Sequence, residues 1–138
     1  MDTNLIVALM DERDLHHRRA LQVLTEIEDA GVEVLYVDCV INEVYTVMAR
    51  RFAERSISDD FPRIADDITS SLANVRMITA YRYLPKIHLE VVELMKQTKG
   101  RLNYHDALIA LTLREEGISG IITLHRDFDE IAWLERIG

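Results

Sequence analysis

Apolar residues recur at helical spacing in five segments of the chain. In the first of them Ala20, Leu24 and Ile27 follow one another three or four positions apart, and the segment stops at Gly31. Such spacing puts the apolar side chains on one face of a helix, and glycine is common just past a helix end. The same pattern predicts helices over residues 16–30, 40–52, 60–73, 84–98 and 104–116.

Short apolar stretches rich in β-branched residues lie between these helices. They cover residues 32–37, 75–79 and 120–124, and each is predicted to be a buried strand. Strands that alternate with helices indicate an α/β fold with a parallel sheet. Residues 128–137 are predicted to form a short final helix with turns.

Composition limits the class of protein. A chain of 138 residues with 49% hydrophobic and 29% charged residues is typical of one globular domain. The longest apolar runs have six residues, whereas a membrane span needs roughly 20, so we expect no membrane segment. No basic and apolar leader follows Met1, which favours a cytoplasmic protein.

Charge and motifs exclude several kinds of chemistry. The 16 basic and 24 acidic residues give a net charge of −8, which argues against a broad basic face for nucleic acid but leaves room for a local basic rim. The five glycines are too scattered for a phosphate-binding loop, and the histidines lack zinc-ligand spacing. The single Cys39 cannot form an internal disulfide.

Acidic side chains follow the predicted strands. Function in open parallel sheets lies at the carboxyl ends of strands. Glu43 follows the first predicted strand on an apolar helix face, Asp106 lies near the start of another amphipathic helix, and the segment 125–130 follows the last strand. Asp2 lies at the opposite end of the chain. We expect an α/β fold to gather such carboxylates at one edge.

Each acid also has a simpler explanation. Asp106 could be a first-turn acid that the helix dipole favours. Glu43 could form a salt bridge with Arg50 or extend its carboxylate to solvent. Asp127 could belong to a solvated capping cluster before the final helix.

Four segments in the same order and spacing resemble the PIN-domain ribonucleases, especially VapC-type toxins: residues 2–6 (DTNLI), 40–44 (VINEV), 103–110 (NYHDALIA) and 122–128 (ITLHRDF). Each motif is short, but together they span the chain. The resemblance implies a single PIN-like domain over residues 1–138, with a Rossmann-like three-layer α/β/α sandwich and a central parallel sheet. It also implies a divalent-metal-dependent endoribonuclease.

The resemblance assigns roles by position. Asp2, Glu43 and Asp106 match the three acids that hold Mg²⁺ or Mn²⁺, Asn4 matches a residue that orders the site, and Thr123 matches the hydroxyl beside a fourth acid. The chemistry is consistent, because three carboxylates within ~5 Å repel one another by several kcal/mol. A hard divalent cation removes that repulsion and can activate water for attack on a phosphodiester.

The chain departs from the family pattern after the last strand. His125 stands where the fourth acid is expected, and Asp127, two positions on, points the same way in an extended segment. We therefore include Asp127 among the candidate catalytic and metal-binding residues. His125 could ligate metal, carry a proton or contact phosphate, and Arg126 or Arg101 could hold phosphate.

The start of the chain departs as well. Family members carry a strand that leads into the first aspartate, whereas only Met1 precedes Asp2. The expectation is a first strand that is missing or truncated in this sequence. The alternative is that residues 5–9 form the edge of the sheet, which would move Asp2 away from the site.

Two functions follow from these observations. The first is a ribonuclease toxin, with RNA as its substrate and tRNA as the first substrate class to test. We expect such a toxin to be held inactive by a small antitoxin and to form a homodimer. The second is a catalytically degenerate PIN-like module that binds RNA or protein. A receiver domain fits the size and alternation, but the last strand is not followed by the expected lysine.

Overall fold

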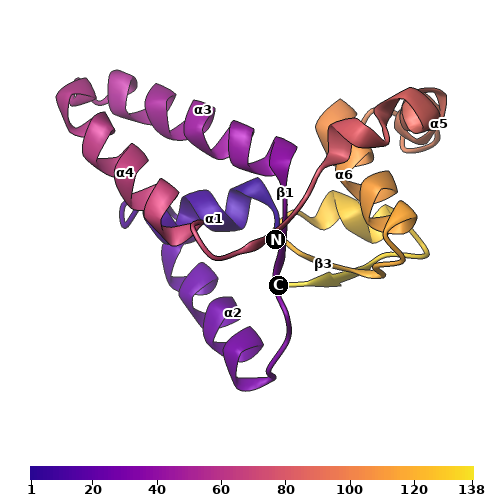
Figure 1. The fold of residues 1–138 in the computed structure, drawn as a ribbon, viewed down its shortest axis with the longest axis horizontal. Coiled ribbons are helices and arrows are strands. Elements are labelled where there is room, and N and C mark those ends of the chain that lie inside the picture. Colours follow the sequence, from indigo (N-terminus) through magenta and orange to yellow (C-terminus); the bar gives the residue numbers. More distant parts are fainter.

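The computed structural model describes residues 1–138 as a mixed α/β domain with six α-helices and four short strands (Figure 1). The helices are α1 (Thr3–Met10), α2 (His17–Asp29), α3 (Asp38–Glu54), α4 (Phe61–Ser71), α5 (Leu84–Gln97) and α6 (Tyr104–Glu115). The strands are β1 (Leu35–Val37), β2 (Arg76–Ile78), β3 (Gly120–Ile122) and β4 (Glu135–Ile137). Short 3₁₀ turns cover Ser58–Asp60, Ala80–Arg82 and Arg126–Glu130. The five predicted helices and three predicted strands are confirmed, with shorter strands than the apolar runs suggested.

The end of α2 shows how the sequence pattern becomes structure. Ala20, Val23 and Ile27 are buried on one face, as their spacing requires. The helix ends at Asp29, and Gly31 adopts a φ of 64°, the left-handed conformation that glycine takes without a steric cost.

The alternative edge strand at residues 5–9 is wrong, because this segment lies within α1. Leu5, Ile6, Val7 and Ala8 are all buried. A helix that is buried on nearly all sides has no polar stripe, so its sequence lacks the period that would identify it. Asp2 caps this helix, and its amide donates a hydrogen bond to the Ile122 carbonyl, which keeps Asp2 beside the end of β3.

The predicted final helix is also wrong. Arg126–Glu130 form a 3₁₀ turn, and the chain then enters β4, which pairs in parallel with β3. Phe128, Ile131 and Leu134 are buried at a spacing of three, which mimics a helical pattern in a chain of turns. The hydrogen bonds that β4 makes along β3, in the register Gly120↔Glu135, outweigh the local preference for helix.

The strands form two parallel pairs that the start of the chain bridges. β1 pairs with β2, and β3 pairs with β4. Between the pairs, the Met1 ammonium donates a hydrogen bond to the Leu35 carbonyl at 2.8 Å, and the Asp2 amide donates one to the Ile122 carbonyl at 2.9 Å. The first two residues therefore hold β1 and β3 in one layer.

Beneath this bridge an apolar groove of about 350 Å³ separates β1 from β3. We call it the strand groove, and its lining includes Met1, Leu35, Ile109, Leu113, Ile121 and Ile137. Burial lowers the pKa of the Met1 ammonium, which lies at its end, to about 6. The groove shows that the parallel layer is open along its middle.

One continuous apolar core joins the helices to this layer. It includes Leu5 from α1, Val40 and Met48 from α3, Ile109 from α6 and Phe128 from the last 3₁₀ turn. No helix is both long enough and apolar enough to cross a membrane. The core thus fixes the starts of α1, α3 and α6 relative to the ends of β1 and β3.

Candidate functional site

A polar cavity of about 240 Å³ lies where β1 and β3 end and where α1, α3 and α6 begin. Ten residues line it: Asp2, Thr3, Asn4, Val7, Glu43, Val47, Arg51, Asn103, Asp106 and His125. The three acids that the sequence analysis selected therefore meet in one cavity, although they come from segments far apart in the chain. We call this cavity the acidic site.

Asp2 is the most deeply held of the three acids. Its Oδ1 accepts a hydrogen bond from the Thr3 amide at 2.7 Å, and its Oδ2 accepts hydrogen bonds from Asn4 Nδ2 and Thr123 Oγ1, both at 2.8 Å. Burial raises the pKa of this carboxyl above its ordinary value even though these donors favour its charged form.

Thr123 and Asn4 tie the end of β3 to α1. The Thr123 hydroxyl accepts hydrogen bonds from Asn4 Nδ2 and from the His125 amide, each at 3.0 Å. The Leu124 amide donates to Asn4 Oδ1 at 3.1 Å. This network orients the Asp2 carboxylate. Asn4 and Thr123 thus have the positions that their expected supporting roles require.

Glu43 lies on the first turns of α3 with its side chain 36% exposed. Its Oε2 accepts a hydrogen bond from Thr3 Oγ1 at 2.9 Å and lies 3.9 Å from His105 Nδ1. Arg50 forms its ion pair with Glu54 instead. The simple salt bridge between Glu43 and Arg50 is therefore absent, and the carboxylate faces the cavity.

Asp106 has a structural role and also belongs to the site. At the start of α6 its amide donates to Asn103 Oδ1 at 3.0 Å, and its Oδ2 accepts from the Asn103 amide at 3.1 Å, which completes a capping box. Burial, together with the smaller effect of the negative charges of Asp2 and Glu43, raises the pKa of Asp106 to about 6. The first-turn explanation is thus correct for the helix but does not account for the neighbouring acids.

The fourth position is occupied by a histidine–carboxylate pair. His125 lines the acidic site, and its Nε2 lies 2.9 Å from Asp127 Oδ2. The edge of the His125 ring also packs against Phe128. Asp127 itself is not among the lining residues, so its carboxylate holds the imidazole instead of entering the cavity.

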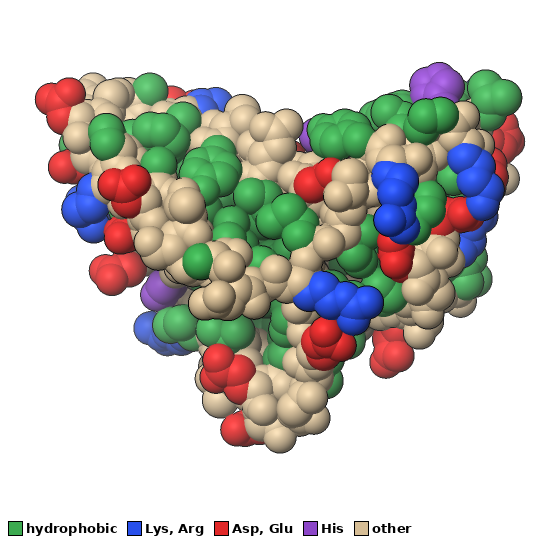
Figure 2. All heavy atoms as spheres, viewed as in Figure 1, with side chains coloured by type: hydrophobic (Ala, Val, Ile, Leu, Met, Phe, Trp, Pro, Cys, Tyr) green, Lys and Arg blue, Asp and Glu red, His purple; other side chains and the backbone are tan.

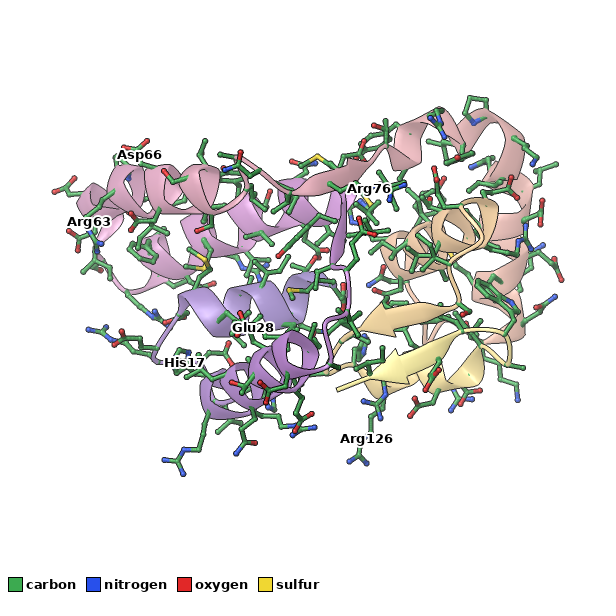
Figure 3. The ribbon with its side chains drawn as sticks, turned by 60° about the horizontal axis from the view of Figure 1, so that its bottom comes forward. His17, Glu28, Arg63, Asp66, Arg76 and Arg126 are labelled. Atoms are coloured by element: carbon green, nitrogen blue, oxygen red, sulfur yellow. The ribbon has the colours of Figure 1, made fainter.

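The arginine in the site is one that the sequence analysis missed. Arg101 pairs with Glu130 at 2.9 Å, and Arg126 points away from the body of the protein (Figure 3). Neither lines the acidic site, whereas Arg51 of α3 does. The sequence pattern that could have identified Arg51 is its position two helical turns after Glu43. Val47 lies between them on the same side of α3.

The donor set of the acidic site fits a hard divalent cation. Its oxygens come from carboxylates, amides and hydroxyls, which Mg²⁺ and Mn²⁺ prefer. Burial is the main cause of the raised pKa values of Asp2 and Asp106, and the negative charge of Glu43 adds to it in both cases. The structure contains no group of three or more histidine, cysteine or acidic side chains already spaced as metal ligands, because the carboxylates turn to the hydrogen-bond donors described above.

Comparison with known protein families agrees with this geometry. A model of the PIN domain family matches residues 1–134, almost the whole chain. No curated protein and no solved structure gave a match. PIN domains have a three-layer α/β/α fold, which confirms the predicted fold class. The chain belongs to the PIN domain family.

Proposed function

We propose that this protein is a divalent-metal-dependent endoribonuclease that hydrolyses RNA phosphodiesters. PIN domains are generally metal-dependent nucleases. The observation that carries the proposal is that Asp2, Glu43 and Asp106, from three distant segments, line one cavity at the ends of parallel strands. Their mutual repulsion is the condition that a bound cation relieves.

The roles of the residues follow from their contacts. Asp2, Glu43 and Asp106 would hold Mg²⁺ or Mn²⁺, which supplies an activated water and stabilises charge on the phosphate. Asn4 and Thr123 hold the Asp2 carboxylate in place.

His125 serves as the proton carrier, since its ring lines the cavity and a carboxylate supports it. Asp127 acts through His125 as a positioning residue, because its contact is with the imidazole and not with the cavity.

Binding of the cation should depend on pH. The pKa of Asp106 is about 6, so below pH 6 a cation must displace a proton from this carboxyl. Each displaced proton makes the apparent affinity about tenfold weaker per pH unit below the pKa. Half of the carboxyl is already protonated at pH 6, so calorimetric titration with Mn²⁺ should show about fivefold weaker binding at pH 5 than at pH 6. Equal affinity at the two pH values would contradict the assignment of Asp106 as a ligand.

The direct test of activity is cleavage of RNA. The protein is incubated with a mixture of tRNA and longer RNA in Mg²⁺ or Mn²⁺, with a parallel sample in EDTA. We expect cleavage only with the metal, and Glu43→Gln, purified in the same way, controls for a contaminating ribonuclease. Cleavage that persists in EDTA or in the Glu43→Gln preparation would refute the assignment.

A degenerate binding module is the second candidate. The absence of ready-made metal spacing and the histidine at the fourth position favour it. RNA that is retained by the protein but stays intact in both metals would select this alternative over the nuclease.

The toxin role rests on the likeness of the sequence to VapC-type toxins and on one surface feature. A cleft of about 220 Å³ between α1, α2, α4 and β1 is lined almost wholly by apolar side chains, which Figure 2 shows gathered beside α4. Contiguous apolar surface of this kind is typical of a protein interface. We infer a small antitoxin as its partner and a homodimer as the free state.

Expression in a bacterial host tests the toxin role. Wild-type protein should arrest growth, and the matched Glu43→Gln variant should not. Growth at the normal rate with wild-type protein present would overturn the toxin role, and a monomeric mass in light scattering would overturn the dimer.

A further inference from the structure

We propose that Arg51 binds a phosphate of the RNA that is distinct from the phosphate under attack. The proposal rests on the ribonuclease function and identifies how that same site engages a longer strand. Arg51 lines the acidic site together with Asp2, Glu43 and Asp106. It is the only lysine or arginine among the ten lining residues, so it supplies the permanent positive charge there.

The guanidinium is fixed by two aspartates through one of its nitrogens. Arg51 Nη1 donates to Asp14 Oδ2 at 2.6 Å and to Asp11 Oδ2 at 2.8 Å. Arg55 also holds Asp11, with Nη1 on Oδ1 at 3.0 Å and Nη2 on Oδ2 at 2.8 Å. The Arg55 guanidinium keeps the pKa of Asp11 at about 2, so this anchor stays charged at any working pH.

The other edge of the Arg51 guanidinium makes no hydrogen bond within the protein. An arginine has five N–H donors, and all the hydrogen bonds that Arg51 makes in the protein use Nη1. Its Nε and Nη2 remain, and these form the planar pair that matches two oxygens of a phosphate. Carboxylates on one edge thus orient the opposite edge for an anion.

The position of Arg51 along α3 decides which phosphate it contacts. Arg51 lies eight residues after Glu43 on one continuous helix, a separation of about 12 Å along the axis. The Arg51 guanidinium contacts Asp11 at the C-terminal end of α1, whereas Asp2 caps the N-terminal end of the same helix. A phosphate at the acids and a phosphate at Arg51 are therefore different groups on the strand. Arg51 therefore extends the site along the RNA backbone.

Binding of RNA measures this contact without cleavage. Asp106→Asn protein in EDTA is titrated with a labelled ten-nucleotide single strand at several salt concentrations. Adding Arg51→Met should weaken binding about tenfold, and the slope of log K against log salt should fall by about 0.7, the value for one phosphate contact on a single strand.

Two matched variants separate phosphate binding from fold effects. Arg55→Met removes a cation from the same Asp11 but lies outside the acidic site, and Arg50→Met changes the exposed neighbour on the same helix. We expect neither to change the salt slope. Arg51→Lys keeps a charge for Asp11 and Asp14 but lacks the planar fork, so it should bind with intermediate affinity even if Arg51→Met fails to fold.

Catalysis gives an independent readout. With metal, Arg51→Met should lower kcat/KM for the oligonucleotide about tenfold, mainly through KM. An unchanged salt slope in Arg51→Met, an Arg51→Lys affinity equal to that of the arginine protein, or an equal change of slope in Arg55→Met would overturn the proposal. A slope change without any cleavage by wild type would refute the nuclease and leave the phosphate contact in place.

Discussion

Asp106→Asn is expected to abolish RNA cleavage and at the same time to stabilise the protein in the absence of metal. Changes to outer-shell partners of a metal already cost about 10–100-fold in activity, so loss of a ligand should cost more than about 100-fold. The asparagine keeps an oxygen that can accept the hydrogen bond from the Asn103 amide, so the capping box of α6 survives.

The gain in stability follows from the raised pKa of Asp106, which is about 6 in the fold against 3.8 for an ordinary aspartate. Between these pH values the folded protein binds the proton more tightly than the unfolded chain, so the free energy of unfolding falls as pH rises and the loss is complete above pH 6. Two pKa units correspond to about 3 kcal/mol, which Asp106→Asn should recover at pH 7 in EDTA.

A matched exposed carboxylate provides the control. Asp66 projects from α4 on the outside of the molecule (Figure 3), so Asp66→Asn should change neither cleavage nor the melting temperature. Wild-type cleavage by Asp106→Asn, or a melting temperature below that of wild type in EDTA at pH 7, would contradict the account of the acidic site.

A second large effect is expected from filling the strand groove. Four β-branched apolar residues placed before Met1 should extend the bridge between β1 and β3 into the groove and bury their side chains there. Each buried side chain contributes about 1.5–3 kcal/mol, against an ordering cost of about 1–2 kcal/mol for its backbone. The extension also converts the buried Met1 ammonium, whose pKa is lowered to about 6, into an uncharged peptide N–H.

The net gain should be about 3 kcal/mol, or a rise of roughly 10 °C in the melting temperature. An extension of four glycine and serine residues removes the same buried charge but supplies no apolar side chains, and it should give a smaller rise. Equal melting temperatures for the two extensions would show that the groove does not accept a strand.

The helices with one apolar face could be predicted from the sequence because the spacing of their buried residues is visible within a single segment of the chain. Residues 16–30 and 84–98 have clear periods, and the structure places α2 and α5 within a residue of these bounds. The same reasoning could not identify α1, since Leu5, Ile6 and Val7 are all buried and no polar stripe marks an outward face. The C-terminal strand depends on pairing with β3, a contact that local periodicity does not encode.

Glu43 could be selected because it follows a strand, and the edge of a parallel layer gathers such residues. Asp2 and Asp106 could be selected with it only through the resemblance of their segments to the PIN-domain motifs. Their hydrogen bonds could not be predicted, because Thr3, Asn4 and Thr123 meet Asp2 and Glu43 only after the ends of the chain come together. Asp127 and Arg51 show the same limit. The spacing of residues along the sequence predicts which face of an element a side chain lies on. It does not predict that Asp127 pairs with His125 or that Arg51 pairs with Asp14, because these contacts depend on the direction of each side chain.

If Asp2, Glu43 and Asp106 form a divalent cation site, Mn²⁺ should raise the melting temperature of the protein, and this experiment needs no knowledge of the RNA substrate. At about 100 times its dissociation constant, a ligand stabilises the fold by about 2.7 kcal/mol, several degrees for a domain of this size. We predict this shift for wild type and Asp66→Asn and none for Asp106→Asn. A cooperative wild-type melt that Mn²⁺ leaves unchanged would contradict the account.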